Sequence, residues 1–139
     1  MSTPDIERLL ASVPTGLWIG GEERLGSSQF DVLDPSNDQV LISVANATAD
    51  DAIAALDAAC AVQAEWAATP ARERGEILRS VFETIIERAD DLAALMTLEM
   101  GKVFAESMGE AKYGAELFRW CAEEAVRIGA RAPASPAGN

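Results

Sequence analysis

The sequence contains no histidine, and this absence removes several kinds of chemistry at once. A Ser-His-Asp triad and a Cys-His pair cannot be built. A zinc, haem or di-iron site with imidazole ligands is excluded for the same reason. The groups that remain for acid–base catalysis near pH 7 are carboxylates, lysines or thiols with shifted pKa values.

Cysteine is almost as scarce, because Cys60 and Cys121 are the only two in the chain. Two thiols form neither a zinc knuckle nor a disulfide framework. Both fall within helical patterns, on or near the apolar face, so we expect buried and unreactive thiols. So few cysteines fit a reducing, cytoplasmic setting.

Positive charge is also in short supply, with 11 Lys and Arg against 23 Asp and Glu and a formal net charge of −12. Such a chain repels phosphate backbones and anionic membrane surfaces, so we expect neither nucleic acid nor membrane as a partner. No apolar run approaches the length of a membrane span, and the first residues lack the apolar core of a signal peptide. What remains, 139 residues with 49% hydrophobic content, indicates one folded domain.

The residue pattern divides the chain into four parts. Residues 1–16 are predicted to be an N-terminal tail. Strands are predicted over 17–45, with a hairpin around the turn-forming residues 34–38. Apolar residues at helical spacing then predict about four helices over 48–129. The Pro-, Ala- and Gly-rich residues 130–139 are predicted to be a linker.

Capping residues set the predicted helix boundaries. Thr48 with Asp51 is typical of a capping box at the start of the first helix. Thr69 is the predicted N-cap of the second helix, with Pro70 at its first position. Gly101 suits the position after the third helix.

The fourth helix is predicted to begin near Ser107, with Glu110 as its capping partner, and to end at Gly129. It carries the only tyrosine, Tyr113, which fits either the edge of a core or the lining of a pocket. Glu106 and Glu110 share a helix face, but without histidine or further carboxylates nearby they do not favour a metal site.

No catalytic motif emerges from the residues themselves. Gly101-Lys102 lacks both the preceding glycine and the following Ser or Thr of a phosphate-binding loop. Neighbouring acids such as Asp90 and Asp91 point about 100° apart on a helix, so they do not share a proton. The residues alone indicate an α+β segment and leave its function open.

Several segments nevertheless follow one another in a distinctive order: Leu17–Glu22, Phe30–Asn37, Trp66–Arg79, Met96–Lys102 and Phe118–Ala125. Together they resemble the N-terminal portion of the aldehyde dehydrogenase superfamily, over residues 17–139. They are similar to succinate-semialdehyde dehydrogenases in particular. One departure is Val103, where that family commonly has proline, and we expect it to alter a helix entry.

The resemblance implies an α/β, aldehyde dehydrogenase-like fold, of which residues 17–129 form the N-terminal part of the cofactor-binding domain. It implies oxidation of succinic semialdehyde or a similar small aldehyde by a homo-oligomeric enzyme that uses NAD or NADP. The family's catalytic cysteine, its catalytic glutamate and its cofactor loop correspond to nothing in this chain. We therefore expect no catalytic or cofactor-binding residue, and no activity or cofactor, for this segment alone.

Two features of the resemblance do fall within the sequence. Tyr113 matches a helix position that lines the family's substrate channel. Val32, through its carbonyl, and Glu99 match positions around a monovalent cation in some members. The alternative to a dehydrogenase segment is a non-catalytic helical interaction module derived from a truncated dehydrogenase.

Under the dehydrogenase interpretation, the helices should pack against residues that this chain does not contain. We then expect exposure of six apolar side chains, namely Leu78, Phe82, Ile85, Leu95, Leu117 and Phe118.

Overall fold

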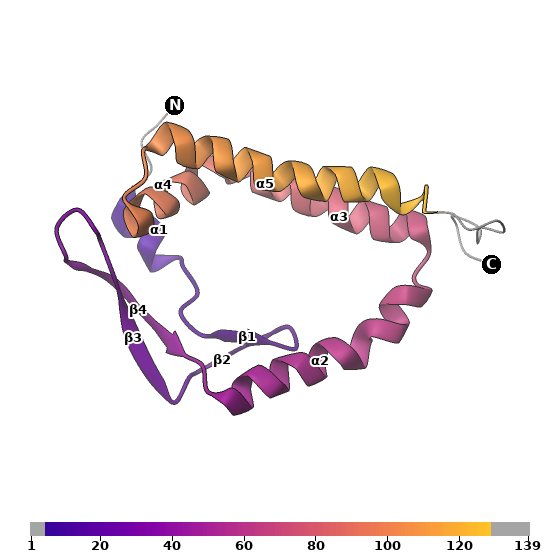
Figure 1. Cartoon of the computed structure of the whole chain (residues 1–139), viewed down its shortest axis with the longest axis horizontal. Coiled ribbons are helices and arrows are strands. Elements are labelled where there is room, and N and C mark those ends of the chain that lie inside the picture. Colours follow the sequence, from indigo (N-terminus) through magenta and orange to yellow (C-terminus); the bar gives the residue numbers. More distant parts are fainter. Residues whose placement is uncertain (1–4, 129–139) are drawn as a thin grey trace.

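The computed structural model describes residues 5–128, which form five helices and two short hairpins (Figure 1). In chain order the elements are α1 (Ile6–Ala11), β1 (Leu17–Ile19), β2 (Glu22–Arg24), β3 (Ser28–Leu33), β4 (Val40–Asn46), α2 (Ala49–Ala68), α3 (Ala71–Glu87), α4 (Ala89–Met100) and α5 (Phe104–Ala125). The strands and four of the helices follow the predicted order. The sequence did not predict α1, which lies within the segment expected to be a tail.

The two hairpins owe their turns to particular residues. Gly20 and Gly21 have φ values of +66° and +84°, which a two-residue turn between β1 and β2 requires. Strands β3 and β4 pair antiparallel, and their register shifts between Val32 and Leu33. The turn that follows is closed by Asp34, whose carboxylate accepts a 2.8 Å hydrogen bond from the backbone N–H of Ser36.

The capping predictions hold for α2 and fail for α3. Thr48 and Asp51 form a capping box, in which the backbone N–H of Asp51 donates to the Thr48 hydroxyl at 3.2 Å. Thr69, expected as the N-cap of α3, instead caps the end of α2 and donates its hydroxyl to the Glu65 carbonyl at 3.1 Å. Pro70 stands at the N-cap of α3 and makes no side-chain capping bond. Only Thr69 and Pro70 separate the two helices, so Thr69 caps the end of α2 and does not cap α3.

The prediction for α4 is confirmed, and that for α5 needs a correction. Gly101 ends α4 in the left-handed conformation, with φ of +68°. Helix α5 begins at Phe104 and not near Ser107, since the backbone N–H of Ser107 already donates to the Val103 carbonyl at 3.0 Å. The Ser107 side chain is fully buried, and its hydroxyl lies 3.2 Å from that of Thr97 on α4. Glu110 is paired with Lys102 and caps nothing. The helix ends at Ala125, before the predicted end at Gly129, and Gly129 itself lies outside the described residues.

The packed part of the molecule is the layer of α3, α4 and α5. Figure 1 shows α5 running along α3, with both hairpins and α2 on the other side of the drawing. The buried apolar residues are mostly small: Leu9, Ile19, Ala89, Ala93, Ala94, Ala111, Ala115 and Ala125. Helix α2 has no buried residue at all. Of the six side chains expected to be exposed, Leu117 is exposed and the other five are half-buried.

Candidate functional site

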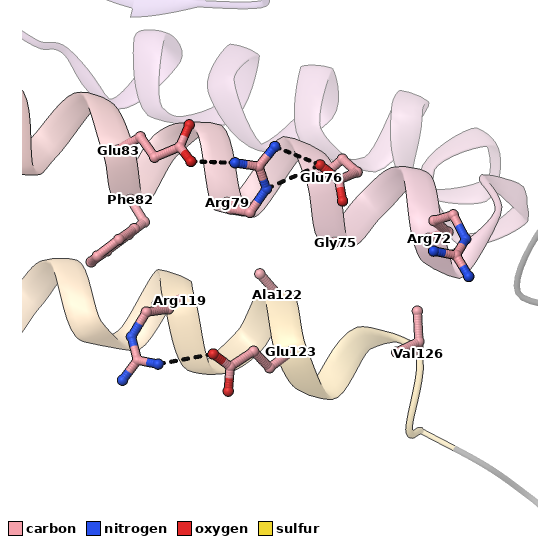
Figure 2. Close-up of a pocket in the computed structure, with 10 residues that line it drawn as sticks. All are labelled: Arg72, Gly75, Glu76, Arg79, Phe82, Glu83, Arg119, Ala122, Glu123 and Val126. Carbon is pink, nitrogen blue, oxygen red and sulfur yellow. Dashed lines mark hydrogen bonds and ion pairs between the residues drawn. The ribbon is translucent and has the colours of Figure 1, made fainter.

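A groove of about 370 Å³ runs between α3 and α5 (Figure 2). Its apolar lining comes from Gly75 and Phe82 on α3 and from Ala122 on α5, with Val126 just beyond the end of α5. Gly75 is the one buried residue of α3, and it lies against the backbone of Ala122. The close approach of the two helices at this glycine therefore lies within the stretch that lines the groove.

The rim of the groove carries two ion-pair clusters with the same spacing. On α3, Arg79 donates to Glu76 at 2.7 Å and also to Glu83, and Figure 2 shows both contacts. On α5, Arg119 donates to Glu123, four residues after it, at 2.8 Å, and it also pairs with Glu116, three residues before it.

Each cluster pairs one arginine with two glutamates, so it keeps a formal charge of about −1. The hydrogen bond to Glu76, followed by the charges of Glu76 and Glu83, raises the pKa of Arg79. Glu116 and then Glu123 do the same for the pKa of Arg119. Both arginines are about half exposed, so these pairs contribute little to stability.

The groove does not suit a nicotinamide dinucleotide. Its pyrophosphate would require free cationic groups or a row of backbone N–H donors at a helix start. Here Arg79 and Arg119 are held by glutamates, which leaves Arg72 as the one arginine of the groove with no ion pair among the described residues. Glu76, Glu83 and Glu123 add negative charge to the same rim, which opposes a pyrophosphate. We therefore assign no cofactor contact to this groove.

Tyr113, the predicted substrate-channel residue, lies on the outer face of α5 and is 81% exposed. Leu117 and Trp120 follow it by one and two turns and are each 64% exposed. The groove lies on a different side of α5, so the structure does not bring Tyr113 together with it. A role in a substrate channel stays a prediction.

The two predicted cation positions lie on segments that meet. Val32 is half-buried at the register shift of β3, and Glu99 is exposed near the end of α4. Their neighbours Pro35 and Gly101 touch, because a Cβ on Gly101 would lie 3.1 Å from Cγ of Pro35. The contact holds the β3–β4 turn against the end of α4. Whether Val32 and Glu99 share a cation stays a prediction.

The prediction of buried thiols is wrong. Cys60 on α2 and Cys121 on α5 are both exposed. Helical spacing placed them near apolar faces, but in the described chain those faces are uncovered. The two residues lie on different helices, and neither is part of the groove.

Within residues 5–128 there is no group of three or more cysteine, aspartate or glutamate side chains arranged to hold a metal ion. Glu110, which shares a helix face with Glu106, is instead paired with Lys102. The hydrogen bond to Glu110 raises the pKa of Lys102. None of the helices in this part of the chain combines the length and apolar character needed to cross a membrane.

The ion-pair clusters are the feature that the sequence analysis missed. Both follow the spacing Glu-x-x-Arg-x-x-x-Glu, at Glu76–Glu83 and at Glu116–Glu123. Residues three and four apart share a helix face, so the repeated spacing could have indicated two matching clusters. Nothing in the sequence indicated that the two would flank one groove.

The chain was compared with known proteins, and residues 21–138 match the family described as "Aldehyde dehydrogenase family". The chain is 52% identical over 99 residues to the succinate-semialdehyde dehydrogenase of Paenarthrobacter nicotinovorans. That match covers 71% of this chain and 22% of the relative. The chain thus spans about a fifth of the length of that relative.

Solved structures contain the same arrangement. A crystal structure described as an E. coli NADP-dependent enzyme superposes with a TM-score of 0.82 at 41% identity, over 88% of this chain and 25% of that one. Betaine aldehyde dehydrogenase from Staphylococcus aureus, in complex with NAD+, gives a TM-score of 0.81 at 29% identity, over 86% and 24%. The fold described above is therefore a recurring part of larger enzymes.

Proposed function

The chain belongs to the aldehyde dehydrogenase family, and we propose that it is the N-terminal segment of a succinate-semialdehyde dehydrogenase that uses NAD or NADP. The observation that supports this choice of substrate is the 52% identity to an enzyme named succinate-semialdehyde dehydrogenase. The substrate would be succinic semialdehyde or a similar small aldehyde, oxidised to the acid. The cofactor, bound elsewhere in the whole enzyme, would accept the hydride.

In this proposal the segment is structural and has no activity by itself. The glutamates on the rim of the groove between α3 and α5 support this, because they would repel the pyrophosphate of a dinucleotide, and the exposed thiols of Cys60 and Cys121 do not adjoin the groove. The proposal includes a homo-oligomeric whole enzyme and a cytoplasmic location. The acidic net charge of −12 supports the absence of nucleic-acid and membrane partners.

The test joins this chain to the part of the Paenarthrobacter enzyme that follows the matched region. Production of NADH or NADPH from succinic semialdehyde is measured for the joined protein and for the 139-residue chain. We expect turnover by the joined protein and none by the chain. Turnover by the chain alone, or a joined protein that folds and binds cofactor but prefers unrelated aldehydes, contradicts the proposal.

The proposal also assigns Tyr113 to the substrate channel and Val32 with Glu99 to a monovalent-cation site. In the joined protein, Tyr113→Ala should change KM for the aldehyde more than it changes KM for the cofactor. Glu99→Gln should remove any difference in thermal stability between sodium and choline chloride. An unchanged KM for the aldehyde would contradict the assignment of Tyr113 to the channel. An unchanged effect of sodium on thermal stability would contradict the assignment of Glu99 to the cation site.

A second candidate function is the non-catalytic interaction module. The observation in its favour is that Tyr113, Leu117 and Trp120 are exposed, which suits a surface for a partner protein. The coding DNA after Asn139 distinguishes the two. Family motifs in frame favour the dehydrogenase segment, and a stop codon with nothing recognisable downstream favours the module.

A further inference from the structure

Helix α2 lacks the packing that holds α3 and α5 together. No residue of α2 is buried, so side-chain packing does little to fix its direction. Figure 1 shows the body of α2 apart from the layer of α3, α4 and α5, which it joins through a short connection to α3. Along its side α2 meets the β1–β2 hairpin, where a Cβ on Gly20 would lie 3.8 Å from that of Ala58. The angle between α2 and α3 therefore depends strongly on the connection between them.

This connection consists of two residues in an extended conformation. Thr69 has φ of −58° and ψ of 133°, and Pro70 has φ of −52° and ψ of 138°. The proline ring fixes φ of Pro70 and disfavours the helical region for Thr69, so α2 and α3 do not merge into one helix. The ψ angle of Pro70 is left as a soft torsion. A few such residues at the ends of elements are what a hinge requires.

Arg74 spans the connection from the α3 side. It lies in the first turn of α3, where its backbone N–H donates to the Pro70 carbonyl at 3.0 Å. Its guanidinium reaches back, and Nη1 donates to the carbonyl of Ala67 at 3.3 Å and also to that of Thr69. Helix α2 has no basic residue in its own last turn, so Arg74 supplies the positive charge that the carbonyl end of a helix favours.

We propose that the Thr69–Pro70 connection is a hinge and that Arg74 is the latch that holds α2 at one angle to α3. When the guanidinium leaves the two carbonyls, α2 swings about the hinge together with the β1–β2 hairpin beside it. The contact between Pro35 and Gly101, where the β3–β4 turn meets the end of α4, limits this swing. The inference goes beyond the proposed function and holds for either candidate function, because every group in it lies on the described chain.

The two cysteines of the chain allow the test without a new labelling site. Cys60 lies on α2, Cys121 lies on α5, and both are exposed. Nitroxide labels on the two thiols report the distance between the helices by pulsed electron paramagnetic resonance. Labelled chain is diluted in unlabelled chain, so that distances within one molecule are measured. Arg74→Met keeps the apolar stem but removes the charge and the donors, and it should broaden the distance distribution about twofold or more relative to the unchanged chain.

The matched control is Arg72→Met, which removes the same charge two residues earlier on α3. Among residues 5–128 Arg72 has no ion pair and no side-chain hydrogen bond to α2, so its loss should leave the distance distribution unchanged. A distribution for Arg74→Met that is no wider than that of the unchanged chain overturns the proposal. Equal broadening by the two variants overturns it as well, because the effect would then belong to charge in general.

Hydrogen exchange separates a latch from a general effect on folding. In Arg74→Met, peptides from the last turn of α2 should exchange faster, because the charge at that helix end is gone. Peptides around Ala122 on α5 should exchange as in the unchanged chain, since Arg74 does not line the groove between α3 and α5. Faster exchange at both places would mean that Arg74 supports the fold as a whole, and it would overturn the latch. None of these measurements uses aldehyde turnover, so their result is independent of the proposed function.

Discussion

A Cβ atom on Gly75 would lie 2.9 Å from the carbonyl oxygen of Ala122, so α3 and α5 meet through their backbones at this point. Real Cβ atoms essentially never come so close to a backbone atom, and neither helix can move without disturbing the other's packing. Both residues of this contact line the groove in Figure 2, between Arg72 toward one end and Phe82 toward the other.

Gly75→Ala should therefore destabilise the chain by about 1–3 kcal/mol, because the added methyl overpacks the crossing. The control is Gly114→Ala on α5, where an added Cβ would meet no atom within 4 Å and alanine should stabilise the helix by about 0.5–1 kcal/mol. Urea unfolding followed by far-UV circular dichroism measures both. Equal signs for the two substitutions would show that the helices do not cross as described.

Ser107 provides a second test of the same helical layer. Its side chain is fully buried, and its hydroxyl pairs with that of Thr97 at 3.2 Å. Ser107→Ala should cost about 1–2 kcal/mol, because Thr97 loses its partner in a partly buried position. Ser80→Ala is the control: Ser80 is exposed and bonds only within its own helix, so its loss should stay within about 0.5 kcal/mol. Urea unfolding of both variants measures the difference, and equal losses would contradict a role for the Ser107–Thr97 pair.

The capping box predicts an acid-sensitive start of α2. The hydrogen bond from the Thr48 hydroxyl, followed by that from its backbone N–H, lowers the pKa of Asp51 below the usual 3.8. A lowered pKa in the folded state means that the ionised carboxylate stabilises the fold above pH 3.8. This contribution is lost as the pH falls through the folded-state pKa.

Thr48→Ala should consequently reduce helicity at pH 6, and the difference from the unchanged chain should shrink as the pH falls below 3.8. Far-UV circular dichroism between pH 6 and pH 2 measures this difference. Asp50→Asn is the control, since the capping bonds involve Asp51 and not Asp50. A difference between the chains that is independent of pH would contradict a role for the carboxylate.

Exposed apolar surface predicts the solution behaviour of the chain. Tyr113, Leu117 and Trp120 stand in water, and each large side chain left exposed forfeits roughly 1.5–3 kcal/mol of burial. At low concentration we expect a helical but loosely packed chain, and at high concentration self-association that overcomes its net charge. Near-UV circular dichroism with light scattering tests this expectation. A monodisperse monomer with one sharp thermal transition would contradict it.

Local chemistry explains where prediction from the sequence succeeded. Gly101 can end a helix in the left-handed region, and Thr48 with Asp51 can satisfy a helix start. Each of these features depends on a few neighbouring residues. The sequence also carried the family resemblance, which the match over residues 21–138 confirms.

Predictions failed where a residue lies between two helices or interacts with a residue on another helix. Thr69 was assigned to the start of α3, although it caps the end of α2. Ser107 was assigned to the start of α5, although it lies within that helix and its hydroxyl pairs with that of Thr97 on α4. Cys60 and Cys121 were expected to be buried because periodicity identifies an apolar face without showing what covers it.

The sequence by itself thus determined the order of the strands and of α2 to α5, the caps at the start of α2 and the end of α4, and the family, because these depend on short-range bonding and on residue order. Only the tertiary structure decided that the core consists mostly of alanines, that Gly75 sets the crossing of α3 and α5, and that Tyr113, Leu117 and Trp120 remain outside. Burial is a property of three-dimensional neighbours, and a helical period is the same whether its face meets protein or water.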